Sequence, residues 1–190
     1  MQGTLPMSRA RALAPAELRH LLAFVSRRRH ALRNATQLLL TYWAGMRVGE
    51  VAALRYDDVV DGNRRIRLQV AVPQGVGRPP RTVMLSAKMR RQLAIYINAY
   101  PPVTMDRPLF YTQKSAGWSA NTLTQHFFHL YRAAGLEGSS QSGRRTFVSS
   151  LARRGIGLEV VGALAGHRRV AATRAAIDSG DPRRDAIEHW

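Results

Sequence analysis

The hydrophobic residues of this chain recur mainly at the spacing of amphipathic helices. After Pro15, a residue that the first turn of a helix tolerates, Leu18, Leu21 and Val25 fall on one helical face. The same spacing predicts further helices at residues 35–43, 48–54, 87–100, 119–134, 142–154 and 158–164, and from residue 170 onward. The chain is therefore expected to be mainly helical.

One stretch between these helices has the character of strands. Asp61-Gly62-Asn63 is a turn signal between a short run that ends at Val60 and a second run over residues 66–72. A third run covers residues 82–85, after a loop rich in proline and glycine at residues 73–80. We expect these runs to form a small three-stranded antiparallel β-sheet within the helical domain.

Length and patterning predict one domain. A chain of 190 residues suffices for one well-cored domain but not for two large ones. We expect residues 1–13 to be an N-terminal extension and residues 14–190 to be a single domain. No apolar run approaches the roughly 20 residues that span a bilayer, and residues 1–14 lack the apolar core of a signal peptide. No membrane partner is therefore expected, and the predicted location is the cytoplasm.

The charge balance indicates a polyanionic partner. Lys and Arg together number 29 against 12 Asp and Glu, which gives a formal net charge of +17. A cationic surface gains free energy when it displaces counterions from nucleic acid, so this excess favours nucleic acid as the partner. A GC-rich genome would explain the preference for arginine over lysine, but it does not explain the shortage of acidic residues.

The sequence predicts neither a metal nor a cofactor. The chain has no cysteine, which excludes disulfides, thiolate metal sites and a cysteine nucleophile. His126 and His129 have a helical spacing that can ligate a metal, but no third ligand is within reach in the sequence. Gly75-Val76-Gly77 lacks the further glycine and the helix of a dinucleotide-binding fingerprint.

The first group of residues with chemical potential follows a glycine break at Gly45. Arg47 stands at the start of the predicted 48–54 helix, where a positive charge is unfavourable unless an anion compensates it. Either a bound phosphate or a buried ion pair with Glu50 would provide that compensation. The spacing alone favours neither.

The second group contains Arg144 and His167. A guanidinium binds two phosphate oxygens bidentately and an imidazole adds a further hydrogen bond, so both could converge on one phosphate. Taken alone, His167 is more typical of a core histidine or a helix cap, and Arg145 of a solvated helix face.

Together these segments resemble the signature boxes of the tyrosine recombinase, or phage integrase, family. The family pattern runs from Gly-x-Arg-x-x-Glu through a hairpin lysine to His-x-x-Arg, Leu-Gly-His and a tyrosine, and the correspondence covers about residues 14–188. The resemblance implies the family's catalytic-domain fold and DNA as the partner. It also implies a clamp in which Arg47, Arg144 and His167 stabilise charge on a phosphate, while a tyrosine attacks and the lysine acts as general acid.

The chain departs from this pattern at three positions that carry the chemistry. Ala176 stands where the tyrosine is expected, and Gln141 replaces the histidine that opens the second box. The loop at residues 73–80 has no lysine, and Gln74 lies nearest to its expected place. Alanine has no nucleophile and glutamine cannot transfer a proton near neutral pH. We therefore predict that the catalytic set is not intact.

Further contacts with DNA are expected on the polar face of the 119–134 helix. Its side chains are of types that suit base edges and phosphates: Asn121, Gln125, His129 and Arg132. Arg145 and Lys114 are additional candidates. Lys114 ends the segment from Leu109, which also resembles the family.

The leading hypothesis is a non-catalytic protein that binds double-stranded DNA and regulates or assists recombination at the nucleoid. Its further partner would be an active recombinase or a second copy of itself. Relatives usually carry an additional N-terminal helical domain, and we expect this chain to lack it. The main alternative is an active recombinase that uses another tyrosine, with Tyr131 and Tyr111 nearest, or one inactivated by substitution at position 176. The second alternative is a protein-interaction module.

Overall fold

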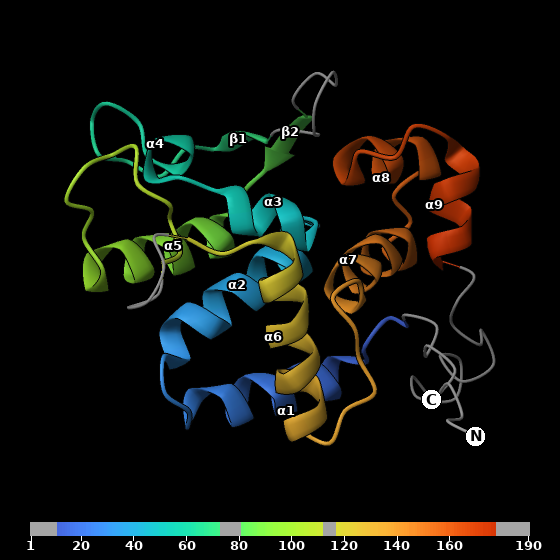
Figure 1. Ribbon diagram of the computed structural model, residues 1–190. Helices are drawn as coiled ribbons and strands as arrows, with labels where there is room; N and C mark the ends of the chain where they lie inside the picture. The colour runs from blue at the N-terminus through green and yellow to red at the C-terminus, as the bar shows by residue number, and fades with distance from the viewer. Residues whose placement is uncertain (1–10, 73–80, 112–116, 178–190) are drawn as a thin grey trace.

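The computed structural model describes residues 11–72, 81–111 and 117–177, and the fold is mainly helical with one small β-sheet (Figure 1). The helices that precede the sheet are α1 (Pro15–Ser26), α2 (Ala31–Trp43), α3 (Val48–Ala53) and α4 (Tyr56–Val59). The strands are β1 (Gln69–Val72) and β2 (Arg81–Met84), and they are followed by α5 (Ala87–Ala99), α6 (Ala120–Ala133), α7 (Ser142–Arg153), α8 (Leu158–Ala165) and α9 (Val170–Ile177). The helices predicted from hydrophobic spacing are confirmed.

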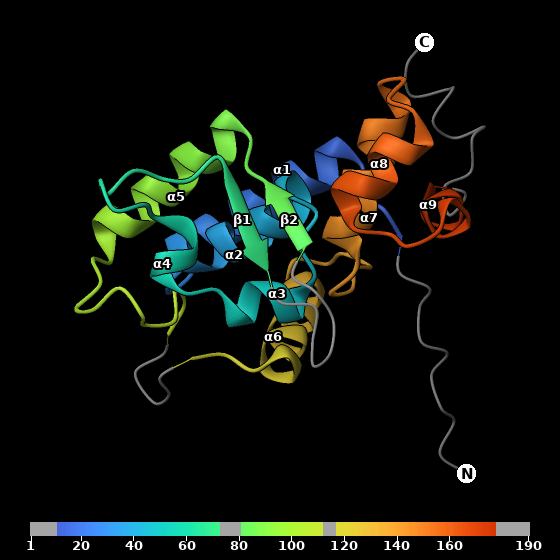
Figure 2. The same ribbon diagram turned by 90° about the horizontal axis from the view of Figure 1, so that it is seen from above.

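Helix α2 forms the centre of the main core. It packs against α1, α3, α5 and α7, so it is surrounded by other helices (Figures 1 and 2). Its residues from Thr36 to Tyr42 are all buried, as expected for a helix that is covered on every side. The helix ends at Trp43, and the chain continues through Gly45 to α3, where the candidate site begins.

The sheet has two strands among the described residues, so the expectation of three strands is wrong. β1 and β2 pair antiparallel, with Val70 opposite Val83. The run that ends at Val60 instead forms the one-turn helix α4, and only an isolated bridge joins Val60 to Ile66. The carboxylate of Asp58 accepts a hydrogen bond from the backbone N–H of Arg55 at 2.7 Å, and this cap favours a helical turn over an extended strand.

The last three helices build a second, smaller apolar cluster. Val148, Val161 and Ala165 form its buried centre, and α7, α8 and α9 stand together on one side of the molecule in both views (Figures 1 and 2). α7 joins this cluster to the main core because it packs closely on α2. The approach requires a glycine at position 143, since a Cβ there would lie 2.7 Å from the Cβ of Thr41.

No helix within the three described segments is both long enough and apolar enough to span a membrane.

Candidate nucleic-acid interface

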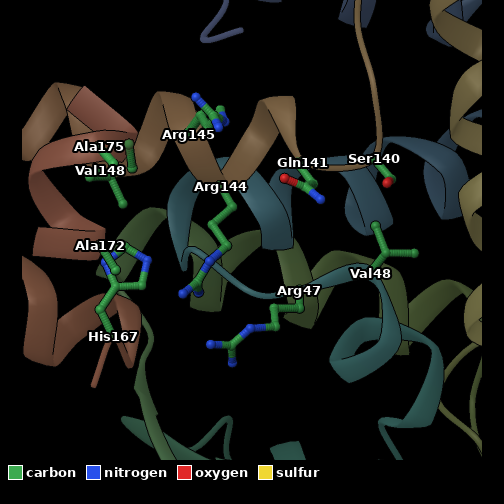
Figure 3. A pocket seen from close by; sticks show the side chains of 11 residues that line it. Arg47, Val48, Ser140, Gln141, Arg144, Arg145, Val148, His167, Ala172 and Ala175 are labelled. Atoms are coloured by element: carbon green, nitrogen blue, oxygen red, sulfur yellow. The ribbon is translucent and has the colours of Figure 1, made fainter. Parts of the chain in front are cut away.

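A pocket of about 550 Å³ lies where α3, α7 and α9 meet (Figure 3). Arg47 comes from the residue before α3, Arg144 from the first turn of α7, and His167 from the segment after α8. In Figure 3 the two guanidinium groups and the imidazole point into the same space. Residues up to 120 positions apart in the sequence thus converge, as the order of the family motifs predicted for these three.

Arg47 is held by Glu50 from one side. The backbone N–H of Arg47 donates to Oε2 of Glu50 at 2.7 Å, and its Nη1 donates to Oε1 at 2.7 Å. The side chain of Arg47 is nevertheless 42% exposed, and that of Glu50 only 5%. The ion pair with Glu50 is therefore present, and the guanidinium still reaches the open pocket. The two interpretations of Arg47 that the spacing left open, an ion pair with Glu50 and a bound phosphate, are therefore compatible.

Arg81 is a site residue that the sequence analysis missed. It donates to both carboxylate oxygens of Glu50, at 2.8 Å from Nε and 2.7 Å from Nη2, and its side chain is 7% exposed. It also donates to the carbonyl oxygens of Gly45 and Leu164, both at 3.3 Å. It therefore ties β2 to α3, to the segment before α3 and to the end of α8. The alternation of side chains along β2 could have indicated this residue, because it places Arg81 on the same buried side of the strand as Val83.

Glu50 is the single carboxylate that compensates this group of arginines among the described residues. Burial alone would raise the pKa of Glu50, but the hydrogen bonds from Arg81 and Arg47 outweigh it, so the pKa lies below its usual range. This one ionised acid pairs with Arg47 and Arg81, while Arg144 adds a third positive charge beside them. The group keeps an excess of positive charge at the pocket, which favours an anion.

Arg144 is the arginine in this group without a described carboxylate partner. Its Nη1 donates to the carbonyl oxygen of Gly45 at 2.5 Å, and no ion pair of Arg144 is found within the described part of the chain. Burial, together with the charges of Arg47 and Arg81, lowers the pKa of Arg144 to about 9. A guanidinium in such surroundings is one that a phosphate would stabilise.

His167 is oriented by Thr173, a fully buried residue of α9. Nδ1 of His167 and Oγ1 of Thr173 are 3.0 Å apart, which leaves Nε2 as the ring nitrogen for a ligand. Burial, followed by the charges of Arg144, Arg47 and Arg81, lowers the pKa of His167 to about 4. The imidazole is therefore neutral near pH 7 and can still donate one hydrogen bond to a phosphate.

The comparisons with known proteins agree with this architecture. The model of the phage integrase family matches residues 11–179. The chain belongs to this family. The tyrosine recombinase XerC of Methylobacterium sp. (strain 4-46) is 33% identical over 174 residues, which cover 90% of this chain and 52% of that relative. The XerC of Methylobacterium nodulans is 29% identical over 165 residues. The chain spans about half the length of both relatives.

Solved structures of family members share the fold. The crystal structure of XerA recombinase superposes with a TM-score of 0.76 at 22% identity and covers 99% of this chain and 66% of XerA. The structure of XerH site-specific recombinase, bound to its difH substrate in a pre-cleavage complex, has a TM-score of 0.69 at 23% identity, over 94% of this chain and 53% of XerH. At these identities the comparison establishes a tyrosine recombinase catalytic-domain fold.

Two positions at which the chain departs from the family pattern line the pocket. Gln141 is the residue that precedes α7, and Ala176 lies on α9 beside Ala172 and Ala175. Gln74 lies outside the described residues. None of the six tyrosines of the chain, all of which are described, lines the pocket. Tyr131 is 1% exposed and its hydroxyl lies 2.9 Å from that of Tyr42 in the core, so it is distant from the chemistry that the alternative hypothesis assigns to it.

The other predicted DNA contacts fall into three groups. Asn121, Gln125, His129 and Arg132 are all exposed on α6, which confirms the predicted polar face. Arg145 borders the pocket but projects from the opposite side of the α7 ribbon from Arg144 (Figure 3). Lys114 lies outside the described residues.

The possible metal pair on α6 is divided between two faces of the helix. His126 turns inward, with Nε2 3.1 Å from Oδ1 of Asn34, whereas His129 is exposed. Within residues 11–72, 81–111 and 117–177 no three His, Asp or Glu side chains gather as metal ligands would.

Proposed function

We propose that this chain is a non-catalytic member of the phage integrase family that binds double-stranded DNA and regulates or assists recombination. The pocket formed by Arg47, Arg144 and His167 would hold one backbone phosphate. Asn121, Gln125, His129 and Arg132, with Arg145 and Lys114, would extend the contact along the duplex. No cofactor or metal takes part, and the protein acts at the nucleoid in the cytoplasm.

The observation that carries the proposal is the excess of positive charge at the pocket. Arg47 and Arg81 both pair with the carboxylate of Glu50, and the third arginine, Arg144, has no acidic partner among the described residues. Desolvated charges cost free energy unless they are paired, so the arrangement is best explained by an anion that completes it. The net charge of +17 supports a polyanion rather than a small ligand. XerH, a relative in fold, was captured on its DNA substrate.

The absence of cutting is inferred from the residues at the pocket. Ala176 occupies the position at which the family pattern has its tyrosine, and the chain's own tyrosines all lie elsewhere. Gln141 and Gln74 supply no proton at neutral pH. Without a nucleophile, the arginines can stabilise a bound phosphodiester but cannot exchange it. Such a protein would occupy a recombination site or join the assembly of an active recombinase or of its own copies.

Capture of a duplex DNA library by the purified chain tests this function. After binding, the sample is divided between a native wash and a wash with SDS. We expect DNA to survive only the native wash, and we expect the affinity for the recovered duplexes to fall steeply with salt. Arg144→Ala should weaken binding by roughly tenfold and reduce the salt slope by about one. The exposed Arg91 of α5 provides a control, since Arg91→Ala should change binding much less.

The outcomes separate the competing functions. DNA that survives SDS would mean a covalent adduct, and the chain would be an active recombinase. Failure to retain any duplex at low salt would favour a protein-interaction module. Equal losses of affinity in Arg144→Ala and Arg91→Ala would still support a DNA-binding protein, but they would contradict the assignment of the pocket as the phosphate site.

A further inference from the structure

A second pocket lies at the end of α1 and is separate from the proposed phosphate pocket. It has a volume of about 440 Å³ and is lined by His20, Ala23, Phe24, Arg27 and Arg28, and we call it the α1 pocket. The two pockets share no lining residue. The backbone N–H of Leu13 donates to Oγ1 of Thr146 at 2.8 Å, which places the start of α1 beside α7. From there the helix runs away from α7, toward the lower left of Figure 1.

The positive charge of the α1 pocket is not compensated within the described part of the chain. Arg27 and Arg28 are exposed, and neither forms an ion pair with a described residue. The one acidic residue of α1, Glu17, is near the other end of the helix and pairs with Arg11. The negative end of the helix dipole at Ser26 favours a cation nearby, but it does not require an aromatic ring beside that cation. The pocket therefore favours an anionic partner.

Phe24 gives the α1 pocket an apolar centre. The ring is half-buried because it packs partly against the core, and the neighbouring Ala23 is exposed. The Cζ atom of Arg28 lies 4.4 Å from the centroid of the Phe24 ring, which is a cation–π distance. Nε2 of His20 lies 2.9 Å from the carbonyl oxygen of Ala134 at the end of α6, and this contact orients the imidazole. The pocket thus combines one aromatic ring with oriented cationic and polar groups.

This combination fits a protein segment better than it fits DNA. Arginine and aromatic side chains are enriched at the centres of protein–protein interfaces. A carboxylate can accept two parallel hydrogen bonds from a guanidinium, and an apolar side chain next to it would cover the Phe24 ring. The backbone of a duplex would use the arginines but would offer no apolar side chain to the ring. His20 and Arg28 are eight residues apart, which corresponds to about 12 Å or two turns of a helix.

We propose that the α1 pocket docks an acidic amphipathic helix of a protein partner, with carboxylates on Arg27 and Arg28 and one apolar side chain on Phe24. This inference goes beyond the proposed function, because it names the surface by which the chain would join another protein. It uses none of the residues of the proposed phosphate pocket, so it holds or fails independently of DNA binding.

A displayed library of random peptides of about 15 residues, long enough for a marginally stable helix, provides the test. Peptides are selected on the purified chain with mixed-sequence duplex DNA in excess, so that surfaces that bind DNA are occupied. We expect the enriched peptides to be rich in Asp and Glu and to carry an apolar residue on the same helical face. After synthesis they should bind Arg28→Glu and Phe24→Ala roughly tenfold more weakly than the native chain. Both variants should retain the duplex affinity of the native chain.

Two exposed residues of α5 provide matched controls. Arg91→Glu repeats the charge reversal and Ile95→Ala repeats the loss of an apolar side chain, and both variants should bind the peptides as the native chain does. Because Phe24 also packs against the core, Arg28→Glu at an exposed position is the deciding variant if Phe24→Ala does not fold.

The outcomes that would overturn the inference are distinct from those that test DNA binding. Enrichment of no peptide would overturn it, as would peptides that bind Arg28→Glu as tightly as the native chain. Loss of duplex affinity in Arg28→Glu, together with displacement of the peptides by DNA, would assign the α1 pocket to DNA. Self-association of the native chain that Arg28→Glu abolishes would assign it to a second copy. A chain that selects such peptides but retains no duplex at low salt would overturn the proposed function and leave this inference in place.

Discussion

Arg81 and Glu50 form a two-point ion pair in which Nε and Nη2 donate to the two carboxylate oxygens at 2.8 and 2.7 Å. Both side chains are nearly excluded from solvent, at 7% and 5% exposure. The pair connects β2 to α3 and lies next to Arg47, which lines the pocket. Because it orients Glu50, which in turn holds Arg47, it determines where one arm of the proposed phosphate clamp stands.

We expect Arg81→Ala to destabilise the protein by about 3–5 kcal/mol, because it leaves a buried carboxylate with reduced compensation. Denaturant unfolding measures the loss. Arg11→Ala is the matched control, since its ion pair with Glu17 is far less buried, at 37% and 26% exposure, and should contribute about 0–1 kcal/mol. Similar losses in the two variants would contradict the assigned role of Arg81.

The glycine at position 45 should resist substitution for two separable reasons. Its φ is +62°, and a Cβ there would lie 2.4 Å from the ring of Phe147. We expect Gly45→Ala to lower the free energy of unfolding by about 2–4 kcal/mol, and to weaken DNA binding as well because the carbonyl of Gly45 accepts from Arg81 and Arg144.

Two other glycines provide controls for this substitution. Gly135 has a φ of +69°, and a Cβ added there would have no atom within 4 Å. Gly135→Ala should therefore lower the free energy of unfolding by the backbone strain alone, about 1 kcal/mol. Gly62 has neither feature, and Gly62→Ala should be close to neutral. If all three substitutions were equally destabilising, close packing against Phe147 would not be the cause.

DNA binding should depend on pH through His167, whose pKa is about 4 in the free protein. A phosphate beside the ring favours the imidazolium, so the pKa of His167 should rise on binding. The complex then holds the proton more tightly than the free protein does. Affinity should therefore increase as the pH falls through the interval between the bound and free pKa values, and should be constant above the bound value.

Binding measured between about pH 5 and 8 checks this expectation. His167→Gln should flatten the profile, whereas His20→Gln, on α1 and outside the residues that line the pocket, should preserve it. The folding stability of the unbound protein should depend on pH in the opposite direction from its affinity for DNA. Its unfolded chain takes up a proton near the ordinary histidine pKa of about 6.5, so stability should fall as the pH drops from there toward 4. An affinity that rises with pH would contradict the phosphate contact.

Restoring a tyrosine at position 176 tests whether the pocket still positions a phosphate for attack. We expect Ala176→Tyr to form a covalent adduct with a nicked duplex chosen from the recovered library, detected as a slowly migrating species in SDS gels. The reaction should be slow, because a missing general acid costs roughly 10²–10⁴-fold. The Arg144→Ala, Ala176→Tyr double variant should form none. An adduct formed equally by the unaltered chain would show that it contains a nucleophile elsewhere.

The sequence by itself determined the helical character of the chain and the main candidates for phosphate binding. Hydrophobic periodicity marks helices locally, since each turn places its apolar residues on one face. The order of the motifs placed Arg47, Arg144 and His167 in one family pattern, and it identified Ala176, Gln141 and Gln74 as departures. These inferences depend on residue identity and on distance along the chain, which the sequence contains.

Only the tertiary structure decided the remaining features. The prediction of a third strand ending at Val60 was wrong because a local cap at Asp58 favoured a helical turn. Arg81 became a site residue only when β2 packed against α3 and α8, so that its charge met Glu50. The exclusion of Tyr131 from the pocket likewise required knowledge of its partner Tyr42. Ion pairs and burial depend on contacts between distant segments, and local patterning does not encode which segments meet.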